Sequence, residues 1–536
     1  MIQVWRTNIQ RWSRNRQLLL RTAAAIAIGG FLAALLIIAV APPAPRFTVS
    51  PFELHLHAQW QKLQQAEEAQ PYEMVRWLDL ATRQIHSLAE ENGFKASAWS
   101  DHEEEGQFAG FEIKPLLEKH GRDPAVIQLW KDFIRTALNP ADTSLKTLEE
   151  RAAAEPPLIT ANLIRAYLTR HQDPGTALSA LMREARFFPQ AELVKAAAFN
   201  LAVELEDRDA LREIAAQPEW WSAQHAGMRQ HAAALIGDLA LQWQALLDYE
   251  SFLDAAWSTV ALALLAAAVW YVILVLHGVR GIWRWLSPLL PFTAGIFSVW
   301  PVFFIDSWQE IGLGMKEDSP FPYDLWYQIG GVGMREELSK LLLASFFMPW
   351  LLWKRAPGGA VMVGAFVGLG FAFEENINYY EGFGGGVPFT RFLSANFLHA
   401  ALTGISTHAL YDLLRTRLGS AERFLLTLGA LVLAHGCYNY VQSIEQIQGS
   451  EIFALMILAM VAWHFLDLVT QECPPSPPRQ MLTPAAVLLV GTALLMAAMF
   501  ISLALLTPER QLLTRAAASC LSTLPVAFIY WRRMQI

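Results

Sequence analysis

The chain has 536 residues, of which 54% are apolar and only 17% are charged, and its formal net charge at pH 7 is −8. This balance excludes an ordinary soluble protein and predicts a membrane protein. The acidic residues concentrate in residues 42–255, which the topology predicted below places outside the cytoplasm. The basic residues line the loops that it places inside, so the net charge does not indicate a nucleic-acid ligand.

Apolar runs long enough to cross a hydrocarbon core of ~30 Å recur along the chain, since a helical crossing takes about 20 residues. We therefore expect an all-α, polytopic membrane protein with about ten transmembrane helices. The predicted spans lie near residues 22–41, 256–276, 287–305, 337–353, 358–377, 392–413, 422–441, 451–470, 483–506 and 512–531.

The first apolar run resembles a secretory signal, because arginines precede it and Ala39-Val40-Ala41 resembles a cleavage site. The run is longer than the apolar core of a signal peptide, and Pro42-Pro43 should obstruct cleavage. We therefore favour a retained transmembrane anchor, with a cleaved signal as the alternative.

Clusters of Lys and Arg fall at alternate ends of the predicted spans, as the positive-inside rule requires if all of them face the cytoplasm. This pattern predicts cytoplasmic N- and C-termini. The predicted organisation is a cytoplasmic N-terminus at 1–21, an anchor at 22–41, an extracytoplasmic helical domain at 42–255, a membrane catalytic core at 256–445 and additional transmembrane helices at 446–536.

The exported region has apolar residues at helical spacing, interrupted by turn signals such as "HQDPG" and "ELEDRD". Ala-Leu pairs at 177, 210 and 240 recur at roughly 30-residue intervals, which favours stacked helix pairs of a tetratricopeptide-like kind. Such a domain would bind a substrate or a regulatory protein. The alternative is a packed helical cap without a ligand.

Neither a disulfide framework nor a metal cluster is predicted in the exported region. All three cysteines, Cys437, Cys473 and Cys520, belong to the membrane half. The stretch "DHEEEG" at 101–106 is interpreted as a solvated acidic loop, because no second pair of ligands stands at a suitable spacing.

Four central spans carry polar side chains where lipid disfavours them. The predicted topology and a rise of 1.5 Å per residue place all four groups in the outer third of the membrane. The residues are Glu336, Glu337 and Lys340; Glu374, Glu375 and Asn376; His399 and Thr403; and His435 and Asn439. By the same measure His408 and Asp412 lie near the cytoplasmic face, where we expect them to pair locally.

Helical spacing relates several of these residues to one another. Lys340 follows Glu336 by four residues and is placed to neutralise one of the two acids. The same spacing puts Phe371 on the face of Glu375, and Asn439 on the face of His435. A GxxxG pair, Gly364 and Gly368, lets a neighbouring helix approach the fifth span closely.

Adjacent carboxylates with nearby histidines are suited to activating water. A buried glutamate can take a proton from water, while histidine and asparagine donate to the developing oxyanion. The sequence contains no GxSxG, no HExxH and no pair of YD/GxGD-type aspartates, which disfavours serine, zincin-like and aspartyl proteases. We therefore predict amide hydrolysis.

The stretches "EELSK", "GFAFEEN" with "NYY", "HAALTG" and "HGCYN" resemble, in order and spacing, the motifs of the PrsW family of bacterial membrane proteases, over roughly residues 285–445. This family belongs to a superfamily of glutamate-dependent membrane proteases with the CAAX prenyl endoproteases. The resemblance implies a protease in the bacterial inner membrane that cuts a membrane-anchored protein, such as an anti-sigma factor, near the extracytoplasmic face.

When the family's motifs are carried over by position, Glu336 and Glu337 match its catalytic acids. Glu375 and Asn376 match its second motif, His399 its third and His435 its fourth, and the resemblance places all of them in the catalytic site. Lys340, Phe371, Thr403 and Asn439 would support them. Members are described both as glutamate hydrolases and as metalloproteases. No cofactor is certain, and two histidines with a glutamate also permit zinc.

Two interpretations from other classes stay open. The first is a proton- or ion-coupled transporter or channel that uses a Glu/His relay, although the membrane region shows no internal symmetry. The second is a non-enzymatic signalling or immunity protein in which the exported domain carries the function.

Overall fold

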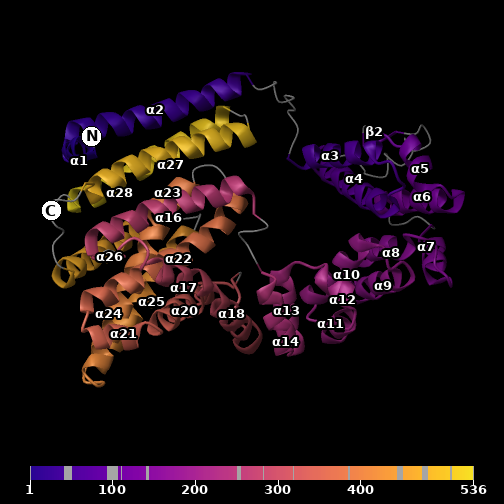
Figure 1. Cartoon of the computed structure of the whole chain (residues 1–536). Coiled ribbons are helices and arrows are strands. Elements are labelled where there is room, and N and C mark those ends of the chain that lie inside the picture. Colours follow the sequence, from indigo (N-terminus) through magenta and orange to yellow (C-terminus); the bar gives the residue numbers. More distant parts are fainter. Residues whose placement is uncertain are drawn as a thin grey trace. The chain divides into compact units, whose positions relative to one another are not determined.

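The computed structural model describes residues 2–40, 51–92, 107–109, 111–139, 144–249, 255–281, 283–317, 319–383, 387–443, 451–473, 481–507 and 510–534. Helices make up nearly all of this structure (Figure 1). The chain divides into two compact units, a membrane unit formed by Met1–Ala44 with Tyr249–Ile536, and a helical unit formed by Pro45–Asp248.

The helical unit consists of helices and one two-stranded antiparallel hairpin. Its elements are α3 (Pro51–Gln65), α4 (Pro71–Asn92), β1 (Gln107–Phe108), β2 (Phe111–Glu112), α5 (Lys114–Gly121), α6 (Pro124–Leu138), α7 (Ser144–Ala153), α8 (Ala161–Thr169), α9 (Pro174–Phe187), α10 (Glu192–Glu204), α11 (Arg208–Ala215), α12 (Pro218–Ser222), α13 (Ala226–Ile236) and α14 (Leu239–Leu247).

Aspartates in the turns start several of these helices. Asp123, Asp173, Asp207 and Asp238 each accept hydrogen bonds from backbone amides in the first turn of α6, α9, α11 and α14. Successive helices such as α8 and α9, or α13 and α14, pack against one another. The tetratricopeptide-like arrangement stays a prediction, and the acidic stretch at 101–106 lies outside the described residues.

A buried carboxylate joins three segments of the helical unit. Glu184 of α9 is fully buried and accepts hydrogen bonds from the Thr160 amide at 2.6 Å, the Asn162 amide at 3.1 Å and the Tyr72 hydroxyl at 3.1 Å. The Thr160 backbone has a left-handed φ of 70° at the start of α8. All three donors are neutral. The Glu184 carboxylate accepts from backbone amides at the start of α8, as the side chain of a helix N-cap does.

The membrane unit is entirely helical over its described residues. Its elements are α1 (Ile2–Trp12), α2 (Arg16–Val40), α16 (Trp257–Gly278), α17 (Leu289–Phe297), α18 (Val299–Leu313), α19 (Tyr323–Trp326), the π-helix η2 (Tyr327–Gly333), α20 (Met334–Ser345), α21 (Met348–Lys354), α22 (Pro357–Phe383), α23 (Val387–Leu393), α24 (Ala395–Arg415), α25 (Ala421–Ser443), α26 (Glu451–Glu472), α27 (Pro484–Leu506) and α28 (Arg510–Arg533).

Among the described residues, eight helices are long and apolar enough to cross a membrane, which confirms the all-α polytopic fold. Two of the ten predicted spans, 337–353 and 392–413, are not among these eight helices. The predicted span 337–353 is divided between α20 and α21, with Pro349 in the first turn of α21. The predicted span 392–413 corresponds mainly to α24, whose histidine, threonine and serine side chains make it more polar than the other spans.

The central helix α22 is largely enclosed by α16, α17 and α24 (Figure 1). Glycines permit its closest approach to α24. A Cβ atom built on Gly364 would lie 2.4 Å from the Thr403 carbonyl oxygen, and one built on Gly368 would lie 2.1 Å from the His399 carbonyl oxygen. The GxxxG pair therefore brings the backbone of α24 into contact with α22.

Candidate active site

The two adjacent glutamates lie in the first turn of α20, which follows directly after the π-helix η2. Glycines let η2 pack on α25, because a Cβ built on Gly436 would lie 2.4 Å from the Ile329 Cα atom. Glu337 is fully buried and Glu336 is 7% exposed. Both carboxylates therefore lie inside the protein, and Glu336 is the more accessible of the two.

Lys340 lies one turn further along α20 and is also fully buried. Its ammonium nitrogen lies 2.7 Å from Glu337 Oε1, 3.5 Å from Glu336 Oε2 and 2.9 Å from His399 Nδ1. It also lies 4.3 Å from the centre of the Phe371 ring. Lys340 thus contacts both acids, and Phe371 contributes the negative face of its ring to the same cation.

His435 of α25 contacts both glutamates. Its Nδ1 atom lies 2.9 Å from Glu337 Oε1, and its Nε2 atom lies 3.6 Å from Glu336 Oε2. The second oxygen of Glu337, Oε2, has no hydrogen-bond partner among the described residues. A further donor or cation at this oxygen would complete the coordination of a carboxylate that is otherwise enclosed.

His399 of α24 connects this group to a second carboxylate. Its Nε2 atom lies 2.9 Å from Glu375 Oε2, and its ring centre lies 5.2 Å from that of His435. Glu375 Oε2 also accepts a hydrogen bond at 2.6 Å from the guanidinium of Arg391 in α23. His399 is therefore held between a lysine on one ring nitrogen and a carboxylate on the other.

Arg391 is a site contact that the sequence interpretation missed. Besides Glu375, its guanidinium donates to Asn376 Oδ1 at 2.6 Å and stacks over the Tyr379 ring at 3.6 Å. Asn376 in turn donates to Asn396 Oδ1 at 2.5 Å. The only sequence signal was a lone arginine in "VPFTRFL", just before the predicted sixth span, with nothing to show its orientation.

A separate polar network fixes the start of α20. Arg335 forms an ion pair with Asp306 of α18 at 2.5 Å and donates to the Gln309 side chain at 3.3 Å. Gln309 donates to the Gly330 carbonyl of η2 at 3.0 Å. The π-helix and the residue before Glu336 are thereby tied to α18, which sequence spacing did not indicate.

Other predicted residues lie apart from this centre. Thr403 is buried in the contact between α22 and α24, and its hydroxyl has no hydrogen-bond partner in the described part of the chain. Asn439 is partly exposed, and no hydrogen bond between its side chain and the described site residues is found. Glu374 is 5% exposed on the same helix as Glu375.

The pairing expected between His408 and Asp412 is not formed. His408 lies 3.7 Å from Glu472 of α26, and Asp412 pairs with Arg415 at 3.4 Å. The acid partner from α26 is distant in sequence, whereas Arg415 lies one turn away from Asp412 on the same helix.

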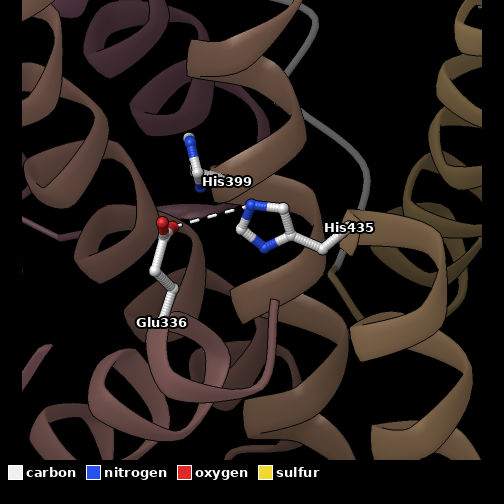
Figure 2. A group of neighbouring side chains, drawn as sticks. All are labelled: Glu336, His399 and His435. Atoms are coloured by element: carbon white, nitrogen blue, oxygen red, sulfur yellow. Dashed lines mark ion pairs between the residues drawn. The ribbon is translucent and has the colours of Figure 1, made fainter. Parts of the chain in front are cut away.

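Glu336, His399 and His435 form a group that could hold a metal ion, with one ligand atom from each within 4.8 Å of the others (Figure 2). Figure 2 shows the Glu336 carboxylate and both imidazole rings converging on one region. Two imidazoles and a carboxylate are a set of ligands that zinc accepts, and each histidine has a carboxylate neighbour of the kind that orients metal-binding histidines.

The charges around the group are compatible with a cation. Three carboxylates, Glu336, Glu337 and Glu375, share two basic partners, Lys340 and Arg391. With neutral histidines this contact network keeps one negative charge in excess. The donor set and the charge balance therefore fit a metal ion, while Lys340 is a cation already in place.

Comparison with known proteins gives one match. Residues 283–466 match the model of a family described as PrsW family intramembrane metalloprotease. Comparisons with curated proteins and with solved structures give no match. The matched segment runs from just before α17 into α26 and contains every residue of the cluster around Glu336. The resemblance predicted from the motifs is confirmed, and the chain carries in its membrane unit a domain of the PrsW family of intramembrane proteases.

Proposed function

We infer that the protein hydrolyses a peptide bond of a membrane-anchored protein, with the buried Glu336–Glu337 cluster as its active site. The observation that carries this inference is the convergence of Glu336, Glu337, His399 and His435, from three helices, on one buried cluster. Membrane proteins place several ionisable groups together in this way almost only for function. The PrsW-family match supports peptide hydrolysis as that function.

Glu336 is the better candidate for the general base. Glu337 is fully buried and has short contacts to Lys340 and His435, at 2.7 and 2.9 Å, that hold it in place. Glu336 is the more exposed, and its contacts to the same two partners are 3.5 and 3.6 Å long. Water can therefore reach Glu336, while Glu337 orients Lys340 and His435.

The histidines would then serve the leaving amine and the oxyanion. His435 lies against both glutamates, so it would accept from Glu336 the proton that this base takes from water and pass it to the leaving amine. His399 is oriented by Glu375 and holds Lys340, whose positive charge would stabilise the oxyanion. Arg391 and Asn376 hold Glu375 and act through it.

A zinc ion is the alternative source of activated water. Glu336, His399 and His435 would hold it, and when bound it would lower the energy of hydroxide formation and polarise the scissile carbonyl. In that case Glu336 is a ligand, and Glu337 and Glu375 orient the two histidines.

We further propose that the protein lies in the bacterial inner membrane with both termini in the cytoplasm. Residues 42–255 would then face the extracytoplasmic side, where the helical unit would bind the substrate or a regulator. The substrate would be a single-span membrane protein, such as an anti-sigma factor, cut near that face. The clusters of Lys and Arg at alternate ends of the predicted spans support this orientation.

The test is a cleavage assay with the full-length protein reconstituted in vesicles and candidate single-span proteins as substrates. Glu336→Gln should reduce the cleavage rate by about 10²- to 10⁴-fold, the range that a general base contributes. Glu337→Gln should reduce it as strongly, because it frees Lys340 and His435. Zinc content measured on the same samples separates the metal-free from the metal-bound mechanism.

Glu472→Gln is the matched control. Glu472 also contacts a histidine, His408, at 3.7 Å, but lies outside the Glu336 cluster. This variant should cleave at the wild-type rate. Wild-type rates in both Glu336→Gln and Glu337→Gln would exclude the proposed active site.

A further inference from the structure

Lys340 has the surroundings of a bound cation. Two carboxylate oxygens and a ring nitrogen surround its ammonium group, which is fully buried and lies above the Phe371 ring. An ammonium has three N–H donors and no acceptor, so these three acceptors account for all of its protons.

The contact with His399 fixes the tautomer of this histidine. Because an ammonium only donates, His399 Nδ1 must be the acceptor of the 2.9 Å hydrogen bond from Lys340. The proton of the neutral ring is then on Nε2, which donates to Glu375 at 2.9 Å. Both ring nitrogens are engaged, and His399 has no free lone pair for a metal.

Glu336 and His435 are also near the ammonium group. Glu336 Oε2 is 3.5 Å from Lys340 Nζ, and the same oxygen is 3.6 Å from His435 Nε2. A divalent ion bound by Glu336, His399 and His435 would have to take the lone pair now given to Lys340, beside a second positive charge.

We propose that the Lys340 ammonium and a metal ion are alternative occupants of one cation position, so that a metal enters only when this lysine withdraws. The proposal deepens the zinc alternative of the proposed function. It gives Lys340 two effects: it balances the charge of Glu336 and Glu337 without metal, and it weakens the affinity of the Glu336–His399–His435 group for metal.

The test is a zinc titration of the purified full-length protein in detergent, with a competing chelator and no substrate. Lys340→Met removes the charge and keeps a side chain of similar length, and it should bind one zinc ion at least about tenfold more tightly than the wild type. Lys340→Arg keeps the charge and should bind zinc as weakly as the wild type. Lys340→Met with His435→Ala should lose the gain.

Lys340→Met removes the positive charge that pairs with two buried acids, and this variant could fail to fold. A second pair of variants therefore tests the proposal with a smaller change in buried charge. Glu337→Gln and Glu337→Gln with Lys340→Gln both keep all three metal ligands, and the second removes one charge of each sign. The double variant should bind zinc at least about tenfold more tightly than the single variant. Equal or weaker zinc binding in the double variant, or unchanged zinc affinity in folded Lys340→Met, would overturn the proposal.

The measurement is independent of proteolysis. If the zinc affinities change as expected but no substrate is cut by the wild type, the proposed function fails and the role of Lys340 stands. If cleavage depends on Glu336 but the zinc affinity does not depend on Lys340, the role of Lys340 fails and the protease stands.

Discussion

Each of the two units buries a glutamate completely. The hydrogen-bond partners of one carboxylate are neutral groups, whereas those of the other are ionisable side chains. Glu184 in the helical unit accepts from two backbone amides and a tyrosine hydroxyl. Glu337 in the membrane unit contacts a lysine and a histidine, and one of its oxygens has no hydrogen-bond partner among the described residues. Burial alone therefore does not identify a reactive carboxylate.

The partners decide what each glutamate can do. Two backbone amides and a tyrosine hydroxyl, all neutral, hold Glu184 in place, which suits a structural link between α4, α8 and α9. Burial raises the pKa of Glu184, and its donors oppose that shift. The partners of Glu337, a lysine and a histidine, can both give up and take up protons. The charges around this carboxylate can therefore change during a reaction.

The largest effect on stability is expected from removing the charge of Glu337. Glu337→Leu leaves the buried Lys340 and His435 without their shortest acid contact, which should cost about 3–5 kcal/mol of folding free energy. Thermal unfolding of the full chain in detergent measures this loss. Restoring much of the stability with the double variant Glu337→Leu, Lys340→Met would show that the unpaired cation is the cause; no recovery would point to packing instead.

Replacing Glu184 tests the structural carboxylate. Glu184→Ala leaves the amides of Thr160 and Asn162 without an acceptor and should destabilise the helical unit by about 2–4 kcal/mol. Hydrogen exchange of the full chain should show faster exchange at the start of α8, with protection in α20 unchanged. Glu213→Gln, which breaks an exposed pair with Arg186, is the control and should stay within about 1 kcal/mol of the wild type.

Arg391 should matter for activity through Glu375 and Asn376. Arg391→Met removes the partner that holds Glu375 and Asn376, so His399 loses its fixed orientation, and cleavage should fall about 10- to 100-fold. Arg391→Lys should recover part of the rate. Arg415→Met breaks an exposed pair with Asp412 and should leave the rate unchanged. Equal rates in Arg391→Met and the wild type would remove this arginine from the site.

The smallest expected effect is a pH response of the helical unit. Burial lowers the pKa of His120, whose Nδ1 accepts from the Gln70 amide and whose Nε2 contacts the Leu63 carbonyl. The unfolded chain takes up a proton as the pH falls below about 6.5, and the folded chain does so only at a lower pH, so folding stability falls as the pH falls through this range. His120→Gln should reduce the difference in hydrogen exchange of α5 between pH 7.5 and 5.5; an unchanged difference would assign the response to other groups.

The sequence predicted the helical fold and the protease family because both depend on local patterns. Apolar runs of about 20 residues identify most spans, and the motifs around Glu336, Glu375, His399 and His435 are read directly. Two predicted spans are not among the eight long apolar helices, because one apolar run ends in a break before Met348 and α24 carries more polar side chains than the other spans.

The missed contacts depend on tertiary packing. Arg391 reaches Glu375 from a separate short helix, and Asp306 reaches Arg335 from α18, so neither pair has a helical spacing that a sequence could reveal. The contact of Lys340 with His399 joins residues 59 positions apart. The predicted i, i+4 pair with Glu336 was formed, but the shorter contact is to Glu337, which follows only from the side-chain conformation.

The central claim is that this cluster activates water for peptide hydrolysis, and cleavage in ¹⁸O-labelled water tests it most directly. Wild-type protein in vesicles should cut a single-span substrate and leave one ¹⁸O atom in the new C-terminal carboxylate, detected by mass spectrometry, while Glu336→Gln yields no such product. A product formed equally by Glu336→Gln, or one without the label, would contradict the account.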